Sequence, residues 1–191
     1  MLNLRTGSWG RILVVALGTL LLAAPASASA SGPWDSLLAP ESACPGQNSA
    51  SASVTEQEQS ALCLLNYARV QRGLPSLTVA SRLQTSSRRK AQDIRHCRQF
   101  SHNACGRDAF YWLRKVGYLR GDAGAGEILA AGTGDVGTPR STMNNWLNSD
   151  EHRTILLTPR FVEVGISVLS GKLRAVHGTA AIWVTHFGYR H

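Results

Sequence analysis

Helix-type patterns come first in this chain and the clearest strand-type patterns come last, and that order constrains the fold most. Apolar residues recur with helical spacing over about residues 55–72, 78–94, 107–116 and 138–147. Later segments are β-branched or aromatic and typical of strands: Phe161–Leu169 and Ala180–Phe187, with Glu127–Ala130 and Lys172–His177 as further candidates. Helices followed by strands with hairpin-length connections predict an α+β domain, in which helices cover an antiparallel sheet.

Local signals set the expected limits of these elements. Thr55 and Glu58 have the spacing of a capping box and predict a helix start, and Gly73 with Pro75 predicts its end. The glycine-rich segment Gly121–Gly126 follows no predicted strand and precedes no Lys-Ser or Lys-Thr pair. We therefore interpret it as a flexible loop and not as a phosphate-binding loop.

The first 30 residues have the pattern of a secretory signal peptide. Two arginines start it, Ile12–Pro25 is an apolar stretch of 14 residues, and small residues follow up to Ala30. A membrane-spanning helix needs roughly 20 apolar residues, so this stretch is too short for an anchor. We expect cleavage after Ala28 or Ala30, export from a bacterial cell, and no transmembrane segment in the mature, extracellular protein.

The exported part divides into a lead-in over residues 31–53, rich in Ser and Pro, and a folded domain over residues 54–191. All of the cysteines lie in it: Cys44, Cys63, Cys97 and Cys105. An even number of cysteines outside the cytoplasm favours two disulfides, for which three pairings exist. Proximity in sequence favours Cys44–Cys63 and Cys97–Cys105, the second closing a short loop around His102.

Six histidines could carry chemistry, but no metalloprotease helix, nucleophile elbow or phosphate loop accompanies them. Taken one at a time, each is expected to be a structural or surface residue. They are His96, His102, His152, His177, His186 and His191.

A series of short motifs changes this expectation for two of the histidines. The series runs Leu-Asn-Tyr-Ala-Arg at 65–69, Phe-Ser-His at 100–102, Gly-Glu-Ile at 126–128, Trp-Leu-Asn-Ser-Asp-Glu-His-Arg at 146–153 and Trp-Val-Thr-His-Phe-Gly at 183–188. In this order it resembles the CAP superfamily of cysteine-rich secretory, antigen 5 and pathogenesis-related 1 proteins, in its bacterial secreted SCP-like branch. The resemblance covers nearly the whole domain and implies a three-layer α-β-α sandwich.

The resemblance also implies a central cleft lined by two histidines and acidic residues, which binds a divalent metal in some members. By motif these positions are His102, His152 and Glu127. Ser149 stands near the place of a second Glu found in many eukaryotic members, and Ile128 replaces the usual Asn. Two neutral imidazoles and one carboxylate suit Zn²⁺ or another divalent cation, with an open position for water. Without metal, the same residues could hold a polar headgroup or simply hydrogen-bond to one another.

Charge suggests a class of partner. The whole chain has a net charge of +8, and removal of two arginines with the signal peptide leaves +6. Basic residues crowd the second predicted helix and its end: Arg82, Arg88, Arg89, Lys90, Arg95 and Arg98. Such a face suits an anionic cell-envelope polymer or lipid, although a plain solvated helix face is the commoner role of such residues. Nucleic acid is disfavoured, because the chain is exported and has no known binding motif.

Three functions are compatible with these features. The leading hypothesis is an extracellular binding module whose cleft takes a divalent metal or a small polar or lipid ligand. The alternative is a metal-assisted hydrolase, most plausibly a peptidase acting on cell-wall or protein substrates, with His102, Glu127 and His152 as its catalytic residues. A third is a structural envelope protein that uses only its basic face. The sequence leaves the enzyme question and the natural partner open.

Overall fold

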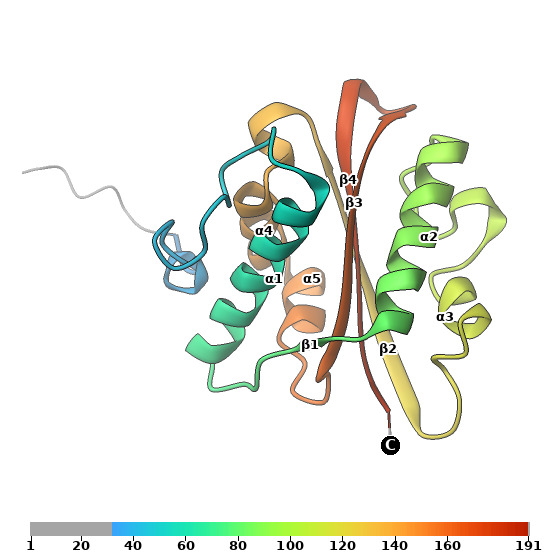
Figure 1. Cartoon of the computed structure of the whole chain (residues 1–191), viewed down its shortest axis with the longest axis horizontal. Helices are drawn as coiled ribbons and strands as arrows, with labels where there is room; N and C mark the ends of the chain where they lie inside the picture. The colour runs from blue at the N-terminus through green and yellow to red at the C-terminus, as the bar shows by residue number, and fades with distance from the viewer. Residues whose placement is uncertain (1–31, 191) are drawn as a thin grey trace, which may run out of the picture. The chain divides into compact units, whose positions relative to one another are not determined.

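A four-stranded sheet forms the middle layer of the protein (Figure 1), and its strands lie in the order β1-β3-β4-β2. The computed structural model describes residues 32–190, so the predicted signal peptide over residues 1–30 lies outside the described residues. The strands are β1 (Thr78–Val79), β2 (Ala123–Gly132), β3 (Glu163–Leu173) and β4 (Val176–Arg190). Strands β2 and β3 both pair antiparallel with β4, whereas β1 adds two parallel residues to the edge of β3. The predicted antiparallel sheet is thus mixed at one edge.

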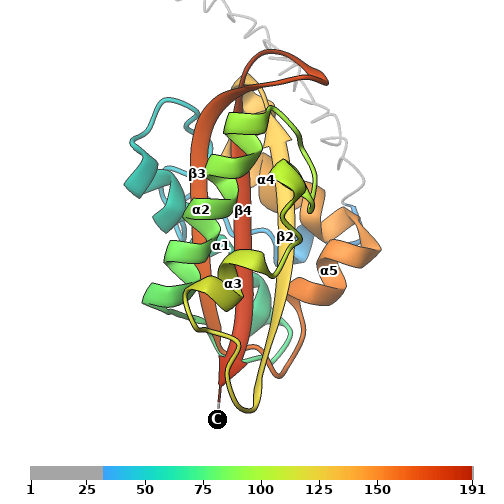
Figure 2. The same ribbon diagram turned by 90° about the vertical axis from the view of Figure 1, so that its right-hand side faces the viewer.

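Helices cover both faces of this sheet. One layer contains α1 (Val54–Gln71), α4 (Pro139–Asn148) and α5 (Asp150–Leu156), and the opposite layer contains α2 (Ser81–Cys97) and α3 (Tyr111–Lys115). Figure 2 shows α2 and α3 lying over the strands in the view turned by 90°. The predicted α+β, three-layer α-β-α architecture is therefore confirmed. Short 3₁₀ segments lie at Asp35–Leu37, Ala104–Gly106 and Gly134–Gly137.

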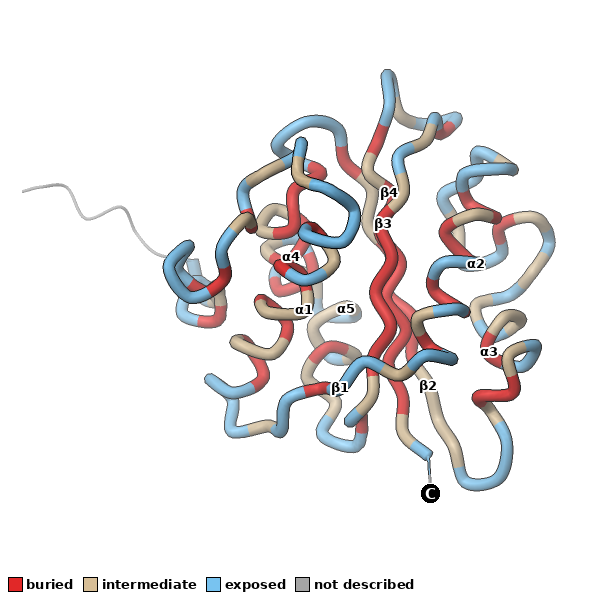
Figure 3. Tube along the Cα trace, viewed as in Figure 1, coloured by how far each residue is buried: buried red, intermediate tan, exposed pale blue. Residues whose placement is uncertain are grey.

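Each face of the sheet has its own apolar core, because successive side chains of a strand point to opposite faces. On β4, Trp183 and Phe187 pack with α1 and α4, whereas Ile182 and Val184 pack with α2. The strands are therefore buried along most of their length (Figure 3). Among residues 32–190, no helix combines the length and the apolar character needed to span a bilayer.

The lead-in is packed onto the domain over residues 32–53. The predicted Cys44–Cys63 disulfide is confirmed and ties the lead-in to α1. The guanidinium of Arg140 on α4 donates to the side-chain oxygen of Gln47 at 2.7 Å. Covalent and polar contacts thus hold the segment on two helices.

The predicted capping box at Thr55 and Glu58 is wrong by two residues. Ser53 and Glu56 form the box, with Glu56 N donating to Ser53 Oγ at 3.3 Å and Ser53 N donating to Glu56 Oε2 at 2.8 Å. Both pairs have the same spacing, so the sequence did not distinguish them. The carboxylate of Glu58 instead accepts a hydrogen bond from the backbone of β3.

Two helix limits also differ from the prediction. Thr78 and Val79 form β1, and α2 begins at Ser81. Helix α3 is shorter than the predicted 107–116, because the carboxylate of Asp108 accepts a hydrogen bond from Phe110 N at 2.8 Å and forms a turn first.

Two strand predictions need correction as well. The glycine-rich segment 121–126 is not a loop throughout, because Ala123 to Gly126 pair with residues 187–190 and begin β2. Residues 172–177 are not a separate strand. They form the tip of the β3–β4 hairpin, which turns at residues 174–175.

Helix α2 lies unusually close to β3 at Gly165. A Cβ atom at this position would lie 2.1 Å from the carbonyl carbon of Leu83 and 2.2 Å from the backbone nitrogen of Gln84. The hydroxyl of Ser87 donates to the Gly165 carbonyl at 2.8 Å. Only glycine permits this contact, which sets the position of α2 on the sheet.

Replacement of Gly165 by alanine should therefore lower the free energy of unfolding by about 3 kcal/mol, because backbone of α2 must move. Urea unfolding measures this loss. The control is Gly124→Ala, where the three atoms nearest to the new Cβ all belong to the side chain of Tyr189 and not to backbone. We expect a loss of about 1 kcal/mol for the control. Equal losses in the two variants would contradict the close backbone contact.

Candidate functional site

A buried carboxylate and a buried imidazole face each other across the sheet. Glu127 on β2 and His186 on β4 are register partners, and both side chains point toward α2. Glu127 is 5% exposed and His186 is fully buried. His186 Nε2 lies 2.8 Å from Glu127 Oε2, and the two form a hydrogen-bonded pair inside the domain.

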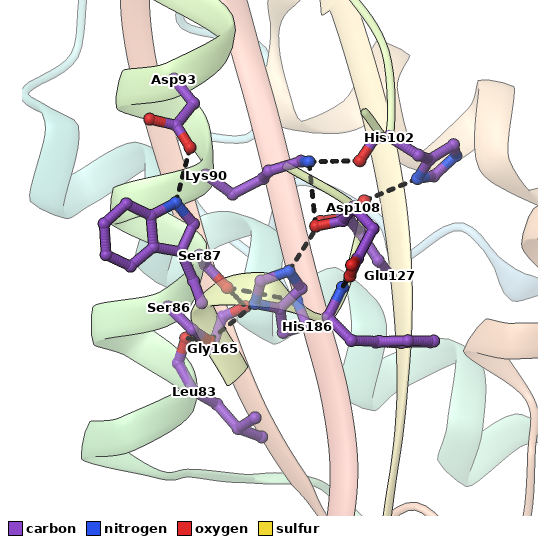
Figure 4. A network of polar contacts seen from close by, with 12 residues as sticks. Leu83, Ser86, Ser87, Lys90, Asp93, His102, Asp108, Glu127, Gly165 and His186 are labelled. Atoms are coloured by element: carbon purple, nitrogen blue, oxygen red, sulfur yellow. Dashed lines mark hydrogen bonds and ion pairs between the residues drawn. The ribbon is translucent and has the colours of Figure 1, made fainter. Parts of the chain in front are cut away.

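His102 approaches the same carboxylate from the loop between α2 and α3. Its Nδ1 lies 2.6 Å from Glu127 Oε1, so an imidazole contacts each carboxylate oxygen (Figure 4). The His102 side chain is 54% exposed, whereas that of Glu127 is 1% exposed. His102 therefore connects the buried pair to the surface.

Helix α2 holds the far side of the His186 ring. Ser86 Oγ lies 2.7 Å from Nδ1 of His186 and also 2.9 Å from the Leu83 carbonyl. The hydroxyl has one proton, so it donates either to Leu83 and accepts from the ring, or to the ring. Where the hydroxyl donates to Nδ1, the neutral ring has its proton on Nε2 and donates it to Glu127. Where the hydroxyl accepts from Nδ1, Nε2 has a proton for the carboxylate only if the ring is an imidazolium.

Lys90 is a fully buried cation beside this group. Its ammonium donates to the backbone carbonyls of His102 and, at 2.9 Å, of Arg107. Burial lowers the pKa of Lys90, and the negative charges of Glu127 and Asp93 oppose that shift. Lys90 therefore does not belong to the predicted basic face: it holds the loop that carries His102.

Two further contacts fix this loop against α2. The predicted Cys97–Cys105 disulfide is confirmed. The carboxylate of Asp93 accepts from Arg107 Nη1 and from the indole nitrogen of Trp112, each at 2.6 Å. These contacts anchor the backbone that follows His102 to helix α2.

Opposing effects act on the charge of Glu127. Burial by itself would raise the pKa of its carboxyl group. The hydrogen bonds from His102 and His186 and the nearby Lys90 charge outweigh burial and hold the pKa below its ordinary value. Glu127 is therefore an ionised acceptor at neutral pH.

His152 lies on α5, in the other helical layer. In the part of the chain that the structure describes, its ring makes no hydrogen bond or ion pair. Burial lowers the pKa of His152, and the charge of His102 acts in the same direction. The structure thus brings His102 and Glu127 into direct contact and leaves His152 coupled to His102 through electrostatics alone.

His186 is the site residue that sequence reasoning missed. A usable signal was present, since this histidine stands within an apolar and aromatic strand pattern. A polar group buried in such a strand requires a hydrogen-bond partner. The identity of that partner depends on the pairing of β2 with β4.

Comparison with known proteins assigns the chain to a family. Residues 62–187 match the model of the CAP, or cysteine-rich secretory protein, family. The chain belongs to this family. The match includes every residue of the polar group described above and confirms the resemblance to the bacterial branch of CAP proteins.

Relatives of the CAP domain occur in several bacteria. The protein YkwD of Bacillus subtilis is 28% identical over 142 residues, which are 73% of this chain and 49% of that protein, so this chain spans about half the length of its relative. An extracellular SCP-domain protein from Bacillus anthracis has a TM-score of 0.57 at 22% identity, over 72% of this chain and 41% of that one. An outer surface protein from Borrelia burgdorferi has a TM-score of 0.59 at 20% identity, over 73% and 97%. These structures share the fold.

The Glu127→Gln variant tests the charge of the buried carboxylate. We expect the free energy of unfolding at pH 7 to fall by about 1–3 kcal/mol, because an amide cannot accept from both imidazoles. Since the native pKa of Glu127 lies below its ordinary 4.5, this contribution is present above pH 4.5 and disappears as the pH falls through the native pKa. Urea unfolding at pH 7, 5, 4 and 3 measures the difference between wild type and variant.

The exposed Glu151 provides the matched control, because Glu151→Gln removes the same charge from the surface. That variant should change stability by less than about 0.5 kcal/mol. A Glu127→Gln deficit that stays constant down to pH 3 would contradict an ionised Glu127.

Proposed function

We propose that the chain is an exported bacterial CAP protein that works outside the cell as a binding module. Three features support export. The first is the signal-peptide pattern ending at Ala28 or Ala30. The second is the pair of disulfides, which form in oxidising compartments. The third is the shared fold with an extracellular protein of Bacillus anthracis.

The proposed binding site consists of His102 and His152, with Glu127 behind His102. The observation that carries this proposal is the 2.6 Å hydrogen bond between His102 Nδ1 and Glu127 Oε1. With a proton on Nδ1, the neutral ring has its lone pair on Nε2, away from the carboxylate. Histidines that bind metals commonly donate their other ring proton to a carboxylate in this way.

A divalent cation could be bound here by two protein ligands, one fewer than the sequence predicted. Both oxygens of Glu127 accept from imidazoles, so its role would be to orient His102 and not to bind the ion. His102 and His152 would be the protein ligands, and water or an oxygen of a small polar ligand would complete the coordination. Between residues 32 and 190, no group of three or more His, Cys, Asp or Glu side chains is arranged to hold a metal ion. Bound there, a divalent cation would act as a Lewis acid.

Zinc titration by calorimetry tests this site. We expect His102→Ala and His152→Ala each to weaken zinc binding at least about tenfold, because each removes one of two ligands. Glu127→Gln should weaken it about tenfold to hundredfold through the orientation of His102. The control His177→Ala removes an exposed imidazole near the hairpin tip and should leave binding unchanged. Binding that survives both the His102 and His152 substitutions would refute the proposal.

A second candidate, a hydrolase acting on wall peptides or proteins, rests on the same hydrogen bond. An exposed imidazole with an ionised carboxylate at Nδ1 has the arrangement of a general base. Ser86 contacts His186, but it is fully buried and cannot reach a substrate. In this candidate the nucleophile is therefore a water molecule activated by His102.

Incubation of the purified protein with peptidoglycan and with casein tests the second candidate. We expect His102→Ala to lower product release about a hundredfold or more if His102 is the base, and the surface control His177→Ala to retain full turnover. Equal turnover in wild type and His102→Ala would exclude this site as the catalytic one.

A further inference from the structure

The positive charge of the domain is concentrated in one helical layer. Residues 81–120, which contain α2 and α3, have ten Lys and Arg residues against two Asp residues. The other described residues, 32–80 and 121–190, have eight Lys and Arg residues against ten Asp and Glu residues. Figure 2 is viewed from the side of the α2 and α3 layer. One side of the sheet thus carries the whole positive excess, and such a field attracts polyanions.

Exposed arginines form two rows along α2, and the first row lies toward α3. It contains Arg82 and Arg89. Arg82 Nη1 donates to the Gly117 carbonyl at 3.2 Å. The Arg89 guanidinium lies over the ring of Trp112, 5.9 Å from its centre. Residues seven positions apart share one side of a helix, so these two arginines follow the helix axis.

The second row contains Arg88 and Arg95 and lies toward β3. A Cβ atom at Gly171 of β3 would lie 2.7 Å from Cγ of Arg95, so the stem of this arginine packs on the strand. The row continues onto the β3–β4 hairpin, where Arg174 N donates to the Arg98 carbonyl at 3.1 Å. Both of these residues are exposed. Tertiary packing therefore extends the basic surface beyond the helix.

The arginine groove lies between the two rows. Its volume is about 370 Å³, and it is lined by Gln84, Thr85, Arg88, Arg89 and Gln92. Over residues 32–190, no acidic side chain forms an ion pair with the arginines of either row. Their charges are therefore available to an external anion.

We infer that the arginine groove binds a linear phosphodiester polymer, which lies along the axis of α2. Guanidinium forks match phosphate oxygens and donate to them in pairs. The charges of such a polymer lie in its main chain, so both rows can contact one chain from opposite sides. Thr85 and Gln92 lie between the rows and offer a hydroxyl and an amide to the same oxygens. The surface is separate from the proposed metal site and adds a second binding activity.

The exposed side of α2 favours this polymer over other anions. It has no apolar side chain to insert into a bilayer. The helix contains no Phe, Tyr or Trp, so the bases of a nucleic acid have no ring on it to stack on. The helix has 17 residues and is about 25 Å long, so its charges suit a chain of phosphates better than one small anion.

The probe is poly(glycerol phosphate), a linear phosphodiester polymer without bases or apolar groups. Calorimetric titration of the purified protein measures its affinity at salt concentrations from about 50 to 200 mM. We expect binding whose logarithmic association constant falls linearly with the logarithm of the salt concentration. Glycerol phosphate monomer, compared at equal phosphate concentration, should bind at least about a hundredfold more weakly, because it contacts the rows at one point.

The Arg88→Gln/Arg89→Gln variant removes one arginine of each row beside the groove. We expect the affinity at low salt to fall about tenfold and the salt dependence to become shallower by about 1 to 2 in slope. Arg88→Lys/Arg89→Lys retains the charge and should keep most of the slope. The matched control is Arg72→Gln/Arg160→Gln, which removes two exposed arginines outside residues 81–120 and should change the affinity by less than about twofold.

Three results would overturn the inference. One is equal affinity and equal salt dependence in Arg88→Gln/Arg89→Gln and in the control. Another is binding of glycerol phosphate as tightly as the polymer, which would indicate a site for a single anion. Phe100 and Phe110 are exposed in the same layer, so vesicles of phosphatidylglycerol and phosphatidylcholine are titrated as well. Tighter binding to these vesicles than to the polymer would assign the surface to a bilayer and is the third.

The arginine groove and the proposed metal site can be tested separately. His102→Ala should leave polymer binding unchanged, and Arg88→Gln/Arg89→Gln should leave the zinc titration unchanged. An unchanged midpoint of urea unfolding shows that the arginine variant is folded. Failure of either site therefore leaves the evidence for the other intact.

Discussion

A carboxylate buried in a protein needs compensation for its lost hydration, and the compensation of Glu127 organises this domain. Two imidazoles contact its oxygens, and the buried ammonium of Lys90 lies close enough to favour its charge. Each partner comes from a different segment: His102 from a loop, His186 from β4 and Lys90 from α2. The carboxylate therefore connects the middle layer to one of its helical layers.

Helix α2 supplies nearly all of the support for this group. Gly165 lets the helix approach the sheet, and its inward side then presents Ser86, Ser87 and Lys90 to the polar residues. Further along the helix, Asp93 and the Cys97 disulfide hold the following loop. The part of His102 that reaches the surface is thus preorganised by contacts that are themselves largely buried, as an accurate binding site requires.

Much of the fold could be predicted from the sequence. Helical periodicity, breaker residues and late β-branched runs gave the order and type of the main elements but not β1 or α5, and sequence proximity gave both disulfides. The ends of the helices and strands were harder to predict. Ser53/Glu56 and Thr55/Glu58 have the same capping spacing, and only the tertiary contact of Glu58 with β3 separates them. The motif series likewise identified His102 and Glu127, which the structure brings into contact.

The amino-acid sequence by itself determined most of the segments that become helices and strands, because side-chain periodicity and backbone preferences act over a few residues. Only the tertiary structure decided that His186 lies opposite Glu127, that Lys90 points inward from a helix otherwise rich in exposed arginines, and that Gln84 closes the edge of β3. These outcomes depend on strand register and on how closely α2 packs against the sheet. Both are set by contacts between residues far apart in the chain, which local patterns do not encode.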